Sequence, residues 1–294
     1  MELSIYLSSY VIIILSILGY GLFFQKILQN SLDIEFEYNL LGSLFFLTSL
    51  SYFTHFFFKH GYVHNTIIII LGIISFIYHF FNSKKLLDKY LKYIFLIFGI
   101  SIFALLAAKT HDDFPYYHFA YSYYITQEPM IVGVGQFNHG FRTHSSIFYL
   151  NSLFYLPLIK YYTFYIPTLL VLGFSNLIFL SNINQHLKSK NLNFKFYLIF
   201  LFFVFFNVFF YRIQEHGTDR SAQILISLLI IQFFYFIDFE KNLKFRIDFI
   251  LILLGLIISL KSFYVLYLLF IFPLIWILNK EKKIDLLKYI FKNR

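Results

Sequence analysis

Long apolar segments recur along the whole chain, and they decide what it can fold into. A helix needs about 20 mostly apolar residues to cross the hydrocarbon core of a membrane. With 59% hydrophobic and 13% charged residues among 294, the chain lacks the polar surface of a water-soluble enzyme, which usually has about 25% charged residues. We therefore predict an all-α polytopic membrane protein with about nine or ten membrane helices, forming one transmembrane domain over 1–294. Nine segments meet or approach the required length: 4–24, 39–58, 64–81, 91–108, 162–181, 196–211, 221–238, 247–261 and 263–279.

A tenth apolar stretch, 146–160, is shorter and contains Asn151 and Pro157. We predict a helix that starts near Ser145 at the outer surface and does not complete a crossing. The first span lacks a basic leader and a small-residue cleavage site, so we expect it to be retained. The domain then divides into four spans over 1–108, an outer loop with the short helix over 109–160, and the remaining spans with a basic tail over 161–294.

The positions of Lys and Arg predict the orientation, because basic residues collect on the cytoplasmic side. With the N-terminus outside and 146–160 not crossing, most of the 24 basic residues fall inside. This topology predicts that 82–90 and 280–294 are cytoplasmic, and that 109–145 and 212–220 lie outside the cytoplasmic (inner) membrane. The net charge of +9 then reflects topology and contact with anionic lipid, with no nucleic-acid partner. The absence of Cys excludes disulfides, thiolate zinc sites and cysteine nucleophiles.

The longest loop, 109–145, holds the first group of candidate functional residues. Asp112 and Asp113 directly follow the fourth span, where an acid pair can serve as a general base or bind a divalent cation; alternatively they are solvated acids that cap a helix. The loop's four histidines lack the i, i+4 spacing of a helical zinc motif, so any metal remains unknown: His111, His118, His139 and His144. The aromatic run 114–124 favours a helix among lipid headgroups, with sugar stacking as the alternative.

Two further polar positions lie on the predicted outer side. The island 214–220 ends in Asp219 and Arg220, where Asp219 could simply cap the next helix. Lys261 lies in an apolar helix by this prediction, where an ammonium either reaches the interface alone or faces a cavity or partner. If these regions form one site, Asp113, His118, Asp219 and Lys261 should converge on an outward-facing cavity.

Five short motifs, in order over about 109–270, resemble those of a bacterial polytopic membrane protein family that is itself similar to the GT-C superfamily of glycosyltransferases. The first is an Asp followed after three residues by Tyr-His, and the last is a Lys before a small polar residue. The motifs are Asp113 with Tyr117-His118, Gly133-Val134-Gly135-Gln136, Ser145-Ser146, Thr218-Asp219 and Lys261-Ser262.

The resemblance implies a GT-C-like fold and transfer of a hexosyl or pentosyl group in cell-envelope polysaccharide biosynthesis. The donor would be a polyprenyl-phosphate-linked sugar, and the acceptor a surface glycan, lipid or protein outside the membrane. It assigns Asp113 as the catalytic acid with Asp112 as its neighbour or substitute. His118, Asp219, Lys261 and Arg220 would bind substrate, with a divalent cation as a conceivable cofactor. Related proteins usually run longer, so we expect a truncated or reduced form.

Two other functions remain open on the sequence. A transporter or flippase for a lipid-linked or polar substrate would also need a charged cavity, although the spans show no convincing internal repeat and few prolines. A membrane assembly subunit without an active site is the third reading. The sugar, the acceptor and the oligomeric state are not specified by these residues.

Overall fold

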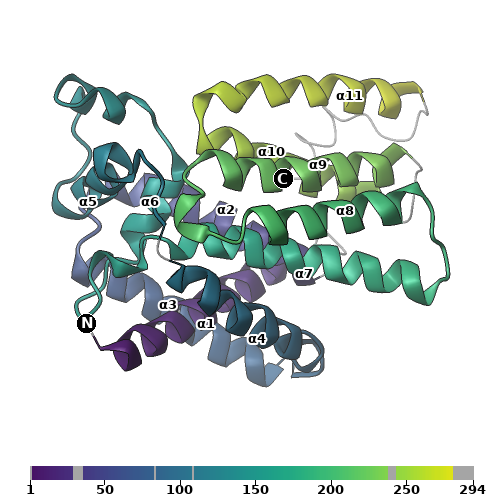
Figure 1. Ribbon diagram of the computed structural model, residues 1–294, viewed down its shortest axis with the longest axis horizontal. Helices are drawn as coiled ribbons and strands as arrows, with labels where there is room; N and C mark the ends of the chain where they lie inside the picture. The colour runs from purple at the N-terminus through teal and green to yellow at the C-terminus, as the bar shows by residue number, and fades with distance from the viewer. Residues whose placement is uncertain (1, 29–35, 83, 108, 238–242, 281–294) are drawn as a thin grey trace.

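The computed structural model describes residues 2–28, 36–82, 84–107, 109–237 and 243–280. Every regular element within these ranges is helical, and the one β-type pairing there is an isolated bridge between Leu156 and Lys160. The predicted all-α class is therefore confirmed. Figure 1 shows α1 (Leu3–Leu28), α3 (Tyr62–Asn82) and α4 (Lys84–Leu106) below the C-terminal helices. The short helices α5 (Phe119–Gln127) and α6 (Ser146–Leu153) lie at one end of the long helices.

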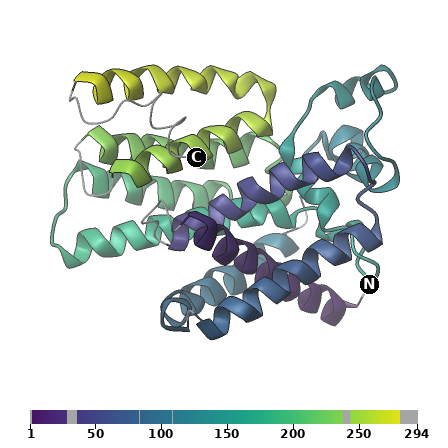
Figure 2. The same ribbon diagram turned by 180° about the vertical axis from the view of Figure 1, so that it is seen from behind.

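The first four long helices are α1 (Leu3–Leu28), α2 (Phe36–His55), α3 (Tyr62–Asn82) and α4 (Lys84–Leu106). Helices α1 and α3 pack closely because small residues face each other: a Cβ on Gly19 or Gly72 would collide with the partner helix. Ser16 donates a hydrogen bond to the carbonyl of Ile69 across this contact, at 3.0 Å. Small residues with polar side chains are a common means of joining helices in a membrane. Figure 2 shows this pair from behind.

The second half contains α7 (Ile166–Lys188), α8 (Phe194–Phe209), α9 (Asp219–Ile237), α10 (Leu243–Leu260) and α11 (Ile271–Lys280). A 3-10 helix, η6 (Ser262–Phe270), leads directly into α11. Helix α7 is buried along most of its length, whereas many aromatic side chains of α8 are exposed. An apolar exposed helix surface suits a lipid environment, where it needs no polar cover.

Among the residues that the structure describes, four helices are long and apolar enough to cross a membrane, judged by length and composition: Leu3–Lys26, Tyr62–Phe81, Tyr161–Lys188 and Asp219–Ile237. Three shorter apolar helices are Tyr90–Leu106, Phe194–Phe209 and Ser262–Leu278. The predicted spans 39–58 and 247–261 form α2 and α10, but neither is among these seven, and α2 buries polar side chains such as Asn39 and Ser51. The four candidate spans indicate a membrane protein, with fewer clear crossings than the nine or ten predicted.

The segment 146–160 forms a helix that is too short to cross. Helix α6 (Ser146–Leu153) has 8 residues, a length of about 12 Å at 1.5 Å per residue. The hydroxyl of Ser145 accepts a hydrogen bond from the backbone N–H of Ile147 at its start. The prediction of a short helix that begins near Ser145 is therefore right.

The sequence predicts Lys261 within an apolar helix, but this prediction is wrong. Lys261 is an extended residue (φ −161°, ψ 133°) between the end of α10 and the start of η6. The chain reverses direction here, so the ammonium group projects from a corner and avoids the cost of an apolar helix interior.

Backbone hydrogen bonds join several of the segments that connect the helices at one end of the molecule. We call this region, which contains the segments after α2 and α4 and the segment between α8 and α9, the site end. The N–H of His60, after α2, donates to the carbonyl of Ile125, in the segment 109–145, at 3.0 Å. The N–H of His111, after α4, donates at 3.0 Å to the carbonyl of Gln214, between α8 and α9. The two polar segments that the sequence predicted on the same side of a membrane are therefore in contact.

Candidate functional site

The loop 109–145 positions its polar residues through a turn and a single turn of π-helix. The π-helix η1 (Phe114–His118) contains Pro115 and continues into α5 (Phe119–Gln127). The carbonyl of Asp113 accepts the backbone N–H of Tyr117 at 3.1 Å and that of His118 at 3.4 Å. A π-helical turn brings residues five apart together, and such turns are frequent at functional sites.

This turn places His111, Asp113 and His118 together. One ligand-type atom from each of the three side chains lies within 4.8 Å of the others. The imidazoles of His111 and His118 have ring centroids 5.2 Å apart. His111 Nδ1 accepts the backbone N–H of Asp113 at 3.1 Å and lies 3.9 Å from its Oδ2. We call these three residues the His–Asp–His cluster.

His118 is the buried member of the cluster, with a side chain only 5% exposed. Burial lowers its pKa to about 4, and the charges of His111, Asp113, Asp219 and Lys261 also act on it. The imidazole is therefore neutral near pH 7. Its Nε2 is buried and makes no hydrogen bond within the described part of the chain.

A second group joins α9 to the corner after α10. The ammonium of Lys261 lies 3.0 and 3.1 Å from the two carboxylate oxygens of Asp219, and Tyr264 donates to the same carboxylate at 2.8 Å. Asp219 is the first residue of α9, but its carboxylate binds side chains from another element. Burial, followed by the carboxylates of Asp113 and Asp219, raises the pKa of Tyr117 to about 12.

A third group surrounds Glu215 in the turn before α9. Its carboxylate contacts Lys109 at 3.1 Å, Arg220 at 3.0 Å and Arg212 at 3.4 Å. Burial on its own would raise the pKa of Glu215, but hydrogen bonds and charges from Lys109 and Arg220 outweigh it and lower the pKa to about 2. This network carries a net positive charge, which suits an anionic ligand.

A cavity of about 390 Å³, lined by members of each group, lies between the segment that follows α4 and the N-terminus of α9. Its lining is largely polar: Lys109, Thr110, His111, Asp112, Glu215, His216, Asp219, Arg220 and Gln223. We call it the polar cavity. It offers carboxylates, imidazoles and cations together, so it can both bind an anionic group and accept a proton.

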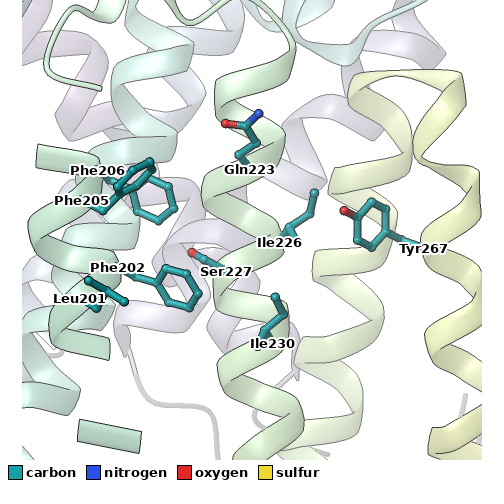
Figure 3. Close-up of a pocket in the computed structure, with 9 residues that line it drawn as sticks. All are labelled: Leu201, Phe202, Phe205, Phe206, Gln223, Ile226, Ser227, Ile230 and Tyr267. Atoms are coloured by element: carbon teal, nitrogen blue, oxygen red, sulfur yellow. The ribbon is translucent and has the colours of Figure 1, made fainter. Parts of the chain in front are cut away.

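An apolar groove of about 370 Å³ begins at Gln223, which lines both spaces. Figure 3 shows aromatic side chains on one side, α9 in the middle and Tyr267 on the other side. The remaining lining is almost entirely apolar: Leu201, Phe202, Phe205, Phe206, Ile226, Ser227 and Ile230. The polar cavity and the apolar groove therefore share Gln223 of α9 as a lining residue.

The structure brings together most of the residues that the sequence singled out. Asp219 contacts Lys261, and both act electrostatically on His118, as does Asp113. Asp112, Asp219 and Arg220 line the polar cavity. Asp113, His118 and Lys261 are not among its lining residues, so the predicted convergence on one cavity holds for Asp219 alone. His139 and His144 do not join the His–Asp–His cluster; His144 instead lies within hydrogen-bonding distance of the hydroxyl of Tyr121.

Sequence reasoning missed four contributors. Lys109 and Glu215 were visible only as charges in polar segments, and no pattern paired them across more than 100 residues. Tyr264 and Gln223 sit in apolar segments, where only their polarity distinguished them. The aromatic run is also partly core: Tyr121 is 2% exposed and its ring stacks on that of Phe141, although Tyr116 remains exposed.

Comparison with known proteins gives one match. No curated protein and no solved structure matches the chain. A family model described as a domain of unknown function (DUF8201) matches residues 3–292, nearly the full length. The chain therefore belongs to the DUF8201 family.

Proposed function

We propose that this protein is a multi-pass enzyme of the cytoplasmic membrane that transfers a sugar from a polyprenyl-phosphate donor. The acceptor is a surface glycan, lipid or protein, and the site end faces the outer side, where the basic-residue distribution places 109–145 and 212–220. The proposal combines the GT-C-like motifs with the arrangement of charge at the site end. A GT-C-like fold is part of the proposal, and the sequence motifs are what supports it.

The observation that carries the proposal is the junction of the polar cavity with the apolar groove at Gln223. A ligand that fits both spaces has a charged or polar head and an aliphatic tail. Arg220, Lys109 and Lys261 supply cations near the head, which favours phosphate. A polyprenyl-phosphate-linked sugar has this chemistry.

The proposed roles follow from the positions of the side chains. Asp113, about half exposed beside His118, accepts the proton of the acceptor hydroxyl, with Asp112 available in the same turn. Lys261 and Arg220 stabilise the negative charge that develops on the departing lipid phosphate. Asp219 holds Lys261 in place through its paired contacts at 3.0 and 3.1 Å.

The groove can be tested apart from the chemistry. Ile226→Trp fills the groove, and we expect it to weaken binding of polyprenyl phosphate to the purified protein at least tenfold, as roughly 1.4 kcal/mol corresponds to a factor of ten. Ile237→Trp, on the same helix but at an exposed position outside the groove, is the matched control and should bind normally. Equal binding by both variants would remove the groove from the proposal.

Transfer itself is tested in a host lacking the gene. The wild-type chain should restore a surface glycan, and Asp113→Asn should leave it absent while the lipid-linked sugar donor accumulates. Translocation of the lipid-linked sugar without cleavage of its sugar–phosphate bond would instead identify a transporter or flippase. Restoration of the glycan by Asp113→Asn, with unchanged donor pools, would favour an assembly subunit.

A further inference from the structure

The geometry points to a binding site for one divalent transition-metal ion, of the Zn²⁺ type, formed by His111, Asp113 and His118. Within the described ranges this is the one group of three or more His, Asp or Glu side chains close enough to share an ion. The inference concerns the protein without substrate, so it stands or falls independently of the proposed glycosyl transfer.

The spacing of the donor atoms suits an ion after a small closure. Ligand atoms about 2.0–2.2 Å from a tetrahedral Zn²⁺ are separated by roughly 3.3 Å, and the three donors here lie within 4.8 Å of one another. Asp113 and His111 are partly exposed, so their side chains can move towards His118. His111 Nδ1 accepts the backbone N–H of Asp113, so its single lone pair points towards the Asp113 side of the cluster, and an ion bound there would replace this hydrogen bond.

An independent observation is the unpaired nitrogen of His118. Its side chain is 95% buried, yet its Nε2 has no hydrogen-bond partner among the described residues. A buried polar atom without a partner carries a free-energy cost of about 1–3 kcal/mol. Coordination of an ion would remove that cost.

Gly217 shows that the two imidazoles lie against a tight backbone turn. It has a left-handed conformation (φ +51°), and a Cβ there would lie 3.0 Å from Cε1 of His118 and 3.5 Å from Cδ2 of His111. Glycine adopts this conformation without steric cost. The absence of a side chain at Gly217 therefore leaves room for both imidazoles beside this turn.

The donor set selects the class of metal. Two imidazole nitrogens and one carboxylate oxygen suit Zn²⁺ and related transition metals, whereas Mg²⁺ and Ca²⁺ prefer oxygen ligands. Three protein ligands with an open position are typical of reactive rather than structural zinc sites. His111 lines the polar cavity, so the open position is within reach of a ligand there. Asp113 can bind an ion through one oxygen and keep the other for a proton, so the site deepens the proposed role of this residue.

The test uses the full-length protein purified in detergent and treated with a chelator. Zn²⁺ binding is measured by equilibrium dialysis, and Co²⁺ is added as a spectroscopic probe of coordination. We expect one Zn²⁺ to bind per chain. We also expect Co²⁺ to show the visible absorption bands of an ion with low coordination number. Asp113→Asn, His118→Gln and His111→Gln should each weaken Zn²⁺ binding at least about tenfold, because even changes behind the ligands cost 10–100-fold.

The matched controls are His139→Gln and Asp112→Asn, which alter the same loop outside the cluster. Both should bind Zn²⁺ within about twofold of the wild type, well below the loss expected for a ligand. Asp113 is half exposed, so Asp113→Asn keeps the test valid even if His118→Gln fails to fold. Absence of stoichiometric binding, or an equal loss in His139→Gln and Asp113→Asn, would overturn the site. Zn²⁺ binding without sugar transfer would leave the site in place and refute only the proposed function.

Discussion

Two histidines at the site end, His60 and His118, are both buried but differ in how their nitrogens are used. His60 Nδ1 lies 2.7 Å from the hydroxyl of Ser152, and its Nε2 lies 3.2 Å from the carbonyl of Ser51. The ring also stacks on His64 at 4.8 Å. His118 has aromatic neighbours too, yet its Nε2 has no partner among the described residues.

The difference separates a structural histidine from a candidate functional one. His60 joins the turn after α2 to α6, and burial together with the charges of His64 and His55 lowers its pKa to about 2, so it is neutral at all ordinary pH values. Next to it, Asn65 donates to the carbonyls of His60, Ser152 and Tyr155. Every donor and acceptor of His60 is used, which stabilises the fold and leaves nothing for a ligand.

The largest expected effect concerns the functional side of this comparison. Asp113→Asn should lower the rate of sugar transfer by about 10²–10⁴, the usual contribution of a positioned acid or base. Its melting temperature should remain close to that of the wild type, since the side chain is about half exposed and asparagine has nearly the same shape. A purified-enzyme assay with a polyprenyl-phosphate sugar donor measures the rate. Full activity in this variant would place catalysis elsewhere.

The structural side is tested by His60→Ala. Loss of its hydrogen bonds and of a fully buried ring should lower the free energy of unfolding by about 2–4 kcal/mol. His118→Ala should cost less, about 1–2 kcal/mol, because it removes packing but no Nε2 hydrogen bond. Denaturant unfolding in detergent compares the two variants. An equal or larger loss for His118→Ala would show that the comparison is wrong.

Acid should weaken the site end through His216 and His118. Burial lowers the pKa of each to about 4, whereas an unfolded histidine titrates near 6.5. Between pH 6.5 and 4 the unfolded chain therefore binds more protons, and stability falls as the pH falls. We expect the melting temperature to drop by a few degrees over this range.

A variant of His216 tests whether this residue causes the pH dependence of the melting temperature. Its Nε2 donates to the carbonyl of Phe210 at 2.6 Å, a bond that His216→Gln can partly replace, so this variant should show a weaker pH dependence between 6.5 and 4. Glu215, whose pKa is lowered to about 2, contributes stability that is present above pH 4.5 and lost as the pH falls towards 2. A melting temperature that is constant from pH 6.5 to 4 would contradict the assignment.

The smallest expected effect on stability is that of Lys261→Met. The ion pair with Asp219 is about one-third exposed on the lysine side, so its loss should cost no more than about 1 kcal/mol. Binding of polyprenyl phosphate should nevertheless weaken, because a cation near the polar cavity is removed. Lys160→Met, in the turn after α6 and outside the polar cavity, is the control. Unchanged phosphate binding in Lys261→Met would assign the cationic role to Arg220 and Lys109 alone.

The site could be anticipated only in part. Asp113, His118, Asp219 and Lys261 stand out because charged residues and histidines are few in this largely apolar sequence. The polar segments that carry Asp113 and Asp219 do meet. The sequence did not show which of the four loop histidines lie close together. His111 and His118 are seven residues apart and become neighbours only through the π-helical turn. His139 and His144 look equivalent to them in the sequence, but the fold places both outside the His–Asp–His cluster.

The sequence by itself determined the helical class, the membrane-compatible surface and the short helix after Ser145, because each depends on local composition and on the lengths of apolar runs. Only the tertiary structure decided that Lys261 is a corner residue paired with Asp219, that Glu215 binds Lys109, and that Gln223 joins a polar cavity to an apolar groove. These contacts bring together residues more than 40 positions apart. They depend on how the helices pack, and a periodic apolar pattern leaves many packings equally favourable.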